Sequence, residues 1–242
     1  MNITNLVRSL RPSVGKNNEA SRERWLEEKL HALPRKNRIL DAGAGTQRYR
    51  TFCEHLDYVS QDFGQYDGQG DAAGLQTQTF DYGKLDIVSD ITAIPEPDAS
   101  FDAIMCIEVL EHLPQPDRAI KEFSRLLKPK GHLILTAPFC SLTHFAPYHF
   151  STGFNRYWYE THLAAQGLNI IEMTPNGNFF EFVAQEMDRI ESISKRYSQK
   201  KPGLIERLSI FIALRMLQRF STADSGSSEL LCFGYHVLAR KE

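Results

Sequence analysis

The feature that most constrains the fold is an apolar run that leads into an acidic residue and two glycines. Residues 38–50 read RILDAGAGTQRYR, with Asp41 shortly before Gly43 and Gly45. Hydrophobic residues then recur at helical spacing, which predicts a strand, a glycine-rich turn and a helix that begins near Gln47. Glycine lets the backbone approach a ligand closely, and a helix start offers free N–H groups. Such a unit is typical of a nucleotide-binding α/β sheet.

Strands and helices alternate along the rest of the chain. The alternation predicts an α/β fold with a doubly wound, mostly parallel sheet. The final strand follows two helices and a polar linker, so we expect it to be antiparallel and to lie at one edge. We predict strands over residues 39–42, 58–62, 85–90, 101–107, 132–137, 168–174 and 230–239, and helices over 19–33, 47–56, 116–128, 154–166, 179–197 and 204–220.

Length and composition set broad limits. A chain of 242 residues suits one large domain, or one domain with an appendage. We expect an N-terminal arm and cap helix over residues 1–35 and a main domain over 36–242, with a helical insertion at about 179–228. The net charge of −2 provides no basic field for nucleic acid. The four cysteines form no CxxC pair, and no signal peptide or long apolar span is evident, so we expect a cytoplasmic protein.

Acidic residues stand where the predicted strands end. Asp62, Asp90 and Glu108 follow the second, third and fourth strands. In open α/β sheets, ligands bind beyond the carboxyl ends of the strands. An acid after the second strand can accept both ribose hydroxyls of a nucleoside, and an acid after the third can meet an adenine amino group. The set predicts a pocket for an adenosine-bearing cofactor.

The choice between NAD and S-adenosylmethionine depends on the first turn. Arg48 stands where a dinucleotide fingerprint has its third glycine. Asp41 would face a diphosphate badly but could favour the ammonium of a methionine moiety, and an acid-lined pocket suits a sulfonium. S-adenosylmethionine is therefore favoured. An NAD-dependent oxidoreductase and a cofactor-binding protein without catalysis stay open as alternatives.

Residues 41–46, DAGAGT, resemble the first motif of the class I S-adenosylmethionine-dependent methyltransferases. Segments 86–91, 101–104, 108–113 and 127–133 resemble the later motifs of this family in order. The resemblance covers about residues 36–175 and the last strand. It implies a Rossmann-like methyltransferase fold with a seven-stranded sheet and an antiparallel last strand. It assigns Asp41, Gly43, Ala44 and Gly45 to the methionine end of S-adenosyl-L-methionine, Asp62 to ribose, Asp90 and Ile91 to adenine, and Glu108 to the vicinity of the methionine moiety.

The segment after the fifth strand, residues 138–158, resembles bacterial methyltransferases of surface-glycan and lipid-linked sugar pathways. This implies a small-molecule, sugar or lipid-linked glycan acceptor. His144 and His149 are candidate bases, because imidazole titrates near neutral pH. Tyr148 and Tyr157 could orient the acceptor. The two histidines alone are too few ligands to indicate a metal, so we predict no metal site.

The helix predicted over 204–220 is apolar on most of its circumference, yet it carries Arg207, Arg215 and Arg219. One interpretation is a helix that is buried or forms a homodimer interface. The other is a helix that lies weakly on a membrane surface, where the arginines and neighbouring lysines would meet anionic lipid. The sequence leaves both open.

Overall fold

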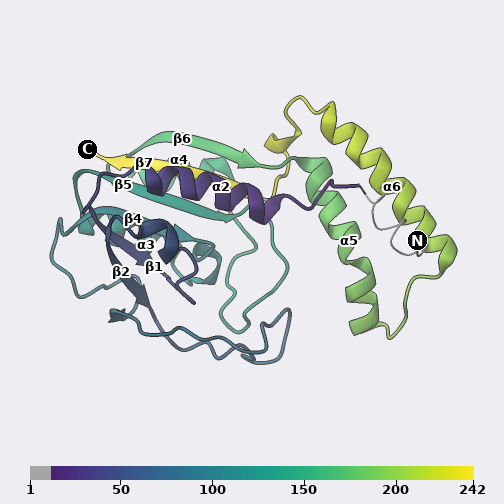
Figure 1. Ribbon diagram of the computed structural model, residues 1–242, viewed down its shortest axis with the longest axis horizontal. Helices are drawn as coiled ribbons and strands as arrows, with labels where there is room; N and C mark the ends of the chain where they lie inside the picture. The colour runs from purple at the N-terminus through teal and green to yellow at the C-terminus, as the bar shows by residue number, and fades with distance from the viewer. Residues whose placement is uncertain (1–11) are drawn as a thin grey trace. The chain divides into compact units, whose positions relative to one another are not determined.

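The computed structural model describes residues 12–242 (Figure 1). The chain divides into two compact units. The larger unit consists of Arg22–Thr174 and Gly234–Glu242, and the smaller unit of Met1–Ser21 and Pro175–Phe233.

The larger unit is built on a seven-stranded sheet with the order β3-β2-β1-β4-β5-β7-β6. The pairs β1–β2, β1–β4, β2–β3 and β4–β5 are parallel, whereas β7 runs antiparallel to β5. These pairings confirm the predicted α/β class and the antiparallel last strand. The strands are β1 (Arg38–Ala42), β2 (Asp57–Asp62), β3 (Ile87–Val88), β4 (Phe101–Ile107), β5 (Leu127–Pro138), β6 (Leu168–Asn176) and β7 (Gly234–Lys241).

We expected the last strand at one edge of the sheet, but the structure places it inside the sheet. It lies between β5 and β6 and pairs with β5 from His132 to Pro138. Val237 and Ala239 in β7 are fully buried. The burial of these apolar side chains stabilises the strand at its position inside the sheet. A strand at the edge would bury less apolar surface.

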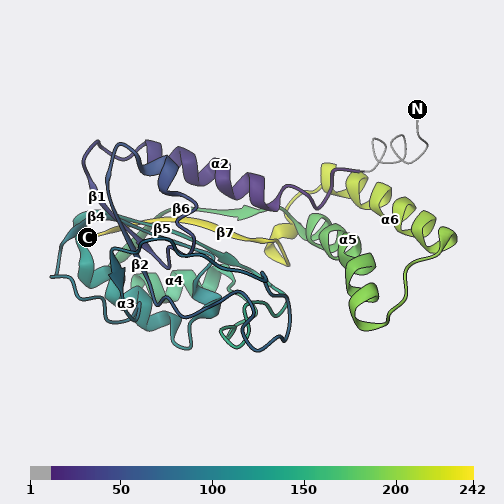
Figure 2. The same cartoon turned by 60° about the horizontal axis from the view of Figure 1, so that its bottom comes forward.

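Helices cover both faces of the sheet in the larger unit. Figure 2 shows α2 (Asn18–His31) on one face, and α3 (Pro116–Leu126) and α4 (Arg156–Ala164) on the other. On the α2 side, Leu26 and Leu30 are buried in one cluster with Ile39 of β1 and Met105 of β4. Two short 3₁₀ helices, η1 (Arg50–Cys53) and η2 (Leu110–His112), follow β1 and β4.

The helix predicted over 47–56 is reduced to η1. Gln47 adopts a left-handed φ of 56°, and its side-chain amide donates to the carbonyl oxygens of Tyr82 (2.8 Å) and Lys84 (2.9 Å). A residue in this conformation cannot continue a right-handed helix. The turn after β1 is therefore held by a loop about 35 positions further along the sequence, and the helix that we expected to begin there does not form.

Other bounds also differ from the prediction. β3 has two residues, because Ser60 binds the side chain of Asp86 through both its amide (2.9 Å) and its hydroxyl (2.8 Å) instead of pairing with a longer strand. β5 starts at Leu127 and passes through Pro129, so α3 ends earlier than predicted. β7 begins only at Gly234.

The smaller unit contains α5 (Phe179–Tyr197), α6 (Leu204–Thr222) and the 3₁₀ helix η3 (Ser227–Glu229). Both long helices were predicted. Val14, Ala184, Leu214 and Leu217 form its buried cluster. Among the described residues, no helix is both long and apolar enough to span a bilayer.

Candidate functional site

A cavity of about 500 Å³ opens at the carboxyl ends of the first four strands. Its volume lies in the range that small-molecule and cofactor sites occupy. Six of the predicted cofactor residues line it, namely Gly43, Gly45, Asp62, Asp90, Ile91 and Glu108. Tyr66, Phe80, Tyr82, Phe145 and Tyr148 add an aromatic wall that the strand-end rule could not predict.

The turn after β1 forms one side of the cavity. Gly43 and Gly45 have φ values of 77° and 50°, in the region that favours glycine. The amides of Gly43 and Ala44 both donate to the carbonyl oxygen of Gln61, at 2.9 and 2.8 Å. Ala44 is buried and does not line the cavity. A Cβ on Gly43 would lie only 2.6 Å from a methyl carbon of Val109, so this position requires glycine.

Asp62 joins the turn to β2. Its two carboxylate oxygens accept hydrogen bonds from the amides of Gly45 (2.9 Å) and Gly64 (3.1 Å). Burial raises the pKa of Asp62, and the backbone hydrogen bonds oppose that shift. Each oxygen has a second acceptor position. Asp62 thus fixes the glycine turn and keeps acceptor capacity for a donor from the cavity.

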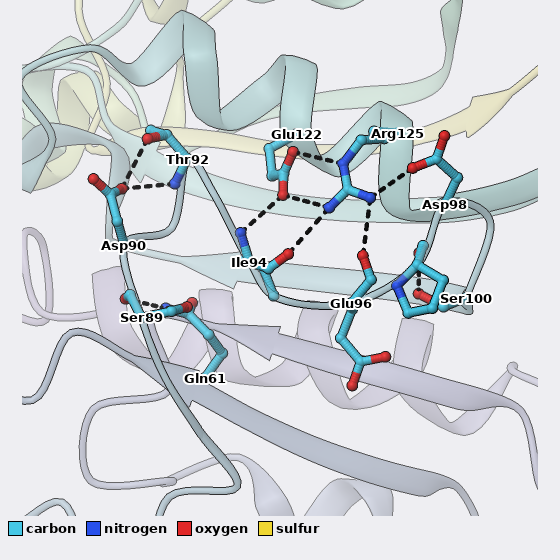
Figure 3. Close-up of polar contacts among 11 residues, drawn as sticks. Gln61, Ser89, Asp90, Thr92, Ile94, Glu96, Asp98, Ser100, Glu122 and Arg125 are labelled. Atoms are coloured by element: carbon cyan, nitrogen blue, oxygen red, sulfur yellow. Dashed lines mark hydrogen bonds and ion pairs between the residues drawn. The ribbon is translucent and has the colours of Figure 1, made fainter.

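Asp90 is held at the cavity by local hydrogen bonds (Figure 3). Its Oδ1 accepts from the amide and the hydroxyl of Thr92, both at 2.8 Å. Gln61 donates to the carbonyl oxygen of the preceding Ser89 at 2.8 Å. These bonds leave Asp90 Oδ2 for a further donor.

Arg125 of α3 fixes the segment beyond Asp90 through several hydrogen bonds (Figure 3). Its guanidinium donates to Glu122 and Asp98 and to the carbonyl oxygen of Ile94. Glu122 in turn accepts from the amide of Ile94 at 2.8 Å. A planar cation that binds several acceptors at once orders an otherwise irregular connection.

Glu108 directly follows β4 and has a strained backbone conformation. Its φ of 56° is uncommon for a residue with a side chain, and such outliers cluster at functional sites. Thr136 donates to Glu108 Oε1 at 2.8 Å, and Arg22 of α2 lies 3.1 Å from Oε2. The carboxylate lines the cavity at a fixed position.

Asp41 does not reach the cavity lining. The carboxyl is 2% exposed and accepts a hydrogen bond of 2.6 Å from the Tyr58 hydroxyl. Burial raises the pKa of Asp41 to about 7; the Tyr58 hydrogen bond lowers it, and the Asp62 charge raises it further. Its surroundings therefore do not place it in direct contact with a cofactor.

The predicted acceptor-side residues divide between the cavity and its surroundings. Tyr148 lines the cavity, but Tyr157 is 60% exposed on α4 and does not. The rings of His144 and His149 lie 4.7 and 6.0 Å from that of His112, which does line it. His149 also lies 3.2 Å from the Ser141 hydroxyl, and burial together with the His144 charge lowers its pKa.

Sequence reasoning gave no chemical role to Glu111 and His112, which η2 places beside the cavity. Glu111 is 1% exposed, and burial followed by the Glu108 charge raises its pKa well above the ordinary value. Burial lowers the pKa of His112 to about 3. The only signal for this pair was the Glu108-x-x-Glu111-His112 spacing after a buried strand.

Comparison with known proteins matches residues 40–135 to the methyltransferase domain family. A ubiquinone biosynthesis O-methyltransferase of Xanthomonas oryzae pv. oryzae is 46% identical over 64 residues, which are 26% of each chain. The enzyme of that name from Paraburkholderia phymatum is 29% identical over 115 residues, 46% of this chain and 47% of the relative. The chain thus matches about a quarter to a half of the length of these relatives.

Solved structures share the fold. An S-adenosylmethionine-dependent methyltransferase from Archaeoglobus fulgidus superimposes with a TM-score of 0.54 and 16% identity, covering 91% of this chain and 92% of that one. The [4+2]-cyclase SpnF superimposes with a TM-score of 0.53 and 20% identity, covering 89% and 79%. The sheet is therefore a Rossmann-like methyltransferase fold.

Proposed function

We propose that this chain, in which residues 40–135 match the methyltransferase domain family, transfers a methyl group from S-adenosyl-L-methionine to a small-molecule acceptor. The observation that carries the proposal is the cavity at the carboxyl ends of the strands, with Gly43, Gly45, Asp62 and Glu108 in its wall. Ligands of doubly wound sheets bind at this position.

The donors and acceptors of the lining suit this cofactor. Asp62 has acceptor capacity left for a ribose hydroxyl, and Asp90 Oδ2 could accept from an adenine amino group beside the apolar side chain of Ile91. Glu108 would provide negative charge near the cationic methionine end. Asp41 would act only indirectly, by supporting the turn that contains Gly43 and Ala44.

Catalysis in this proposal depends mainly on position. When bound, S-adenosylmethionine would supply the methyl group as an electrophile. The chain would hold the acceptor in line with that group, and the aromatic wall around Tyr148 would orient it and exclude water. His144 and His149 are the proposed bases for a proton that the acceptor gives up, because they lie next to His112 behind the lining.

A hydroxyl is the acceptor group that we favour. The relatives named above are O-methyltransferases of ubiquinone biosynthesis, and a histidine base suits a hydroxyl better than an amine that is already nucleophilic. Within this group, we propose a small molecule, a sugar or a lipid-linked glycan, as the segment 138–158 suggests.

Calorimetric titration tests the cofactor. The chain should bind S-adenosylmethionine and S-adenosylhomocysteine but not NAD; binding of NAD alone would replace the proposal by an oxidoreductase. Transfer of a radiolabelled methyl group to fractions of a cell extract then tests catalysis. Cofactor binding without labelled product in any fraction would favour the alternative of a binding protein.

A further inference from the structure

Three hydrogen-bond acceptors converge beside the cavity, where η2 meets the loop that follows β5. Oε1 of Glu111 lies 3.7 Å from Nε2 of His112 and 3.9 Å from Nε2 of His144. One potential ligand atom from each of the three residues lies within 4.8 Å of the other two. Glu111 and His112 come from η2, whereas His144 is 32 positions beyond His112 in the sequence.

The backbone fixes which ring nitrogens carry protons. His112 Nδ1 lies 2.5 Å from the carbonyl oxygen of Tyr148, and His144 Nδ1 lies 2.8 Å from that of Leu142. A carbonyl oxygen only accepts, so each Nδ1 donates. In a neutral imidazole the other nitrogen then carries a lone pair. Both Nε2 atoms near Glu111 are therefore acceptors.

The backbone amide of Glu111 itself donates to the carboxylate, but one carboxylate oxygen is left without a donor in the described part of the chain. Its carboxyl is buried, and among the described residues its Oε2 has no hydrogen-bond partner. Burying such a group unpaired is costly, and two neighbouring lone pairs increase the cost. Either a proton on Glu111 or a cation between the three residues would remove the conflict.

We propose that Glu111, His112 and His144 bind one divalent transition-metal ion. Two imidazoles and a carboxylate form a donor set that suits Zn²⁺, Fe²⁺ or Co²⁺ better than the hard ions Mg²⁺ and Ca²⁺. The bonds from Nδ1 to carbonyl oxygens are the outer contacts that orient metal-bound histidines. A tetrahedral ion with bonds near 2.1 Å holds its ligands about 3.4 Å apart. Because the three ligand atoms lie within 4.8 Å of one another, the site needs to contract by up to about 1.4 Å.

The metal site would take part in acceptor binding, a step that rests on the proposed function. His112 lines the cavity, so the ion would lie in its wall. A hydroxyl bound to such an ion loses its proton more easily. With an ion bound, His144 is a ligand, and His149 is the remaining candidate to receive that proton. The substrate class would then be hydroxyl compounds that can coordinate a metal.

Metal binding can be measured without the cofactor. The full chain, first dialysed against a chelator, is titrated with Co²⁺ and followed by its visible absorption. We expect one Co²⁺ per chain, displaced by Zn²⁺ and not by Mg²⁺. Glu111→Gln and His144→Gln should each weaken Co²⁺ binding at least about tenfold, whereas His31→Gln on the exposed end of α2 should leave it unchanged.

The outcomes separate this inference from the proposed function. An intact chain that binds no Co²⁺ overturns the metal site, and so does a Glu111→Gln chain that binds it as tightly as the original. His144→Gln changes a surface loop and serves if the Glu111 variant does not fold, as judged by circular dichroism. S-adenosylhomocysteine binding is titrated in parallel. A chain that binds Co²⁺ but not S-adenosylhomocysteine would support the metal site and contradict the proposed methyltransferase. A chain that binds S-adenosylhomocysteine but not Co²⁺ would support the methyltransferase and contradict the metal site.

Discussion

The Tyr58 hydroxyl donates a 2.6 Å hydrogen bond to the carboxyl of Asp41 in the interior of the larger unit. Burial raises the pKa of Asp41 to about 7, from an ordinary value of 3.8. The folded chain therefore holds this proton more tightly than the unfolded chain. The resulting contribution to the free energy of unfolding is complete below about pH 4 and is lost as the pH rises through about 7.

Asp41→Asn should remove this pH dependence, because asparagine stays neutral and its oxygen can still accept from Tyr58. Between pH 4 and pH 7, the free energy of unfolding of the original chain should fall relative to the variant by up to about 4 kcal/mol. Urea unfolding at several pH values measures this difference in the free energy of unfolding. Asp57→Asn, at an exposed position of β2, is the control and should follow the original chain. Parallel curves for the original chain and Asp41→Asn would contradict the assignment.

The parts of the fold that the sequence predicted well are those in which local pattern and packing agree. β4 and α5 have the predicted bounds, since an unbroken apolar run and a regular apolar stripe each suit only one element. The helix at 47–56 failed because Gln47 is held by carbonyls 35 and 37 positions away. The insertion of β7 between β5 and β6 depends on strand pairing, which no local pattern records.

The site was predictable to a similar degree. Asp62, Asp90 and Glu108 line the cavity because the carboxyl ends of parallel strands meet at one edge of the sheet. Asp41 is part of β1 itself, so its side chain is packed within the sheet and binds Tyr58. The approach of His144 to Glu111 depends on the path of the loop after β5, which sequence spacing does not specify.

Gly43→Ala tests the turn. The substitution places a Cβ at a φ of 77° and within 2.6 Å of Val109. We expect the free energy of unfolding to fall by about 2–4 kcal/mol, from backbone strain and overpacking together. Gly167→Ala is a matched control with a φ of 67° and no atom within 4 Å of the added Cβ. It should cost only about 1 kcal/mol, and equal losses would exclude the Val109 contact as a cause.

Asp62→Asn tests the proposed ribose contact. The amide has only one acceptor oxygen, and its NH₂ group can only donate, so one backbone bond and part of the binding capacity are lost. We expect the dissociation constant for S-adenosylhomocysteine to rise about 10–100-fold in calorimetry. Asp67→Asn provides the comparison, because Asp67 also accepts two backbone amides, from Gln69 and Gly70, but does not line the cavity. Unchanged affinity in Asp62→Asn would refute the ribose assignment.

The exposed apolar stripe of α6 suits either interpretation of this helix, and we propose weak contact with an anionic membrane surface as the one to test first. Leu204, Leu208 and Ile212 recur every fourth residue and are 89%, 58% and 59% exposed. Arg207 and Arg215 on the same helix would meet anionic headgroups. The chain should therefore float with vesicles that contain an anionic lipid, and less with neutral vesicles or at high salt.

Leu204→Glu combined with Leu208→Glu should abolish this flotation, because each leucine would contribute about 2 kcal/mol when buried in the interface. The control variant leaves Ile205 unchanged, because Ile205 is also apolar and 82% exposed. Ser209→Glu alone adds charge to the same helix without removing an apolar side chain, and it should retain most of the binding. If the original chain stays in the soluble fraction with every vesicle, the membrane contact is wrong. A dimer found by light scattering, and disrupted by the leucine substitutions, would instead assign this face to a second copy of the chain.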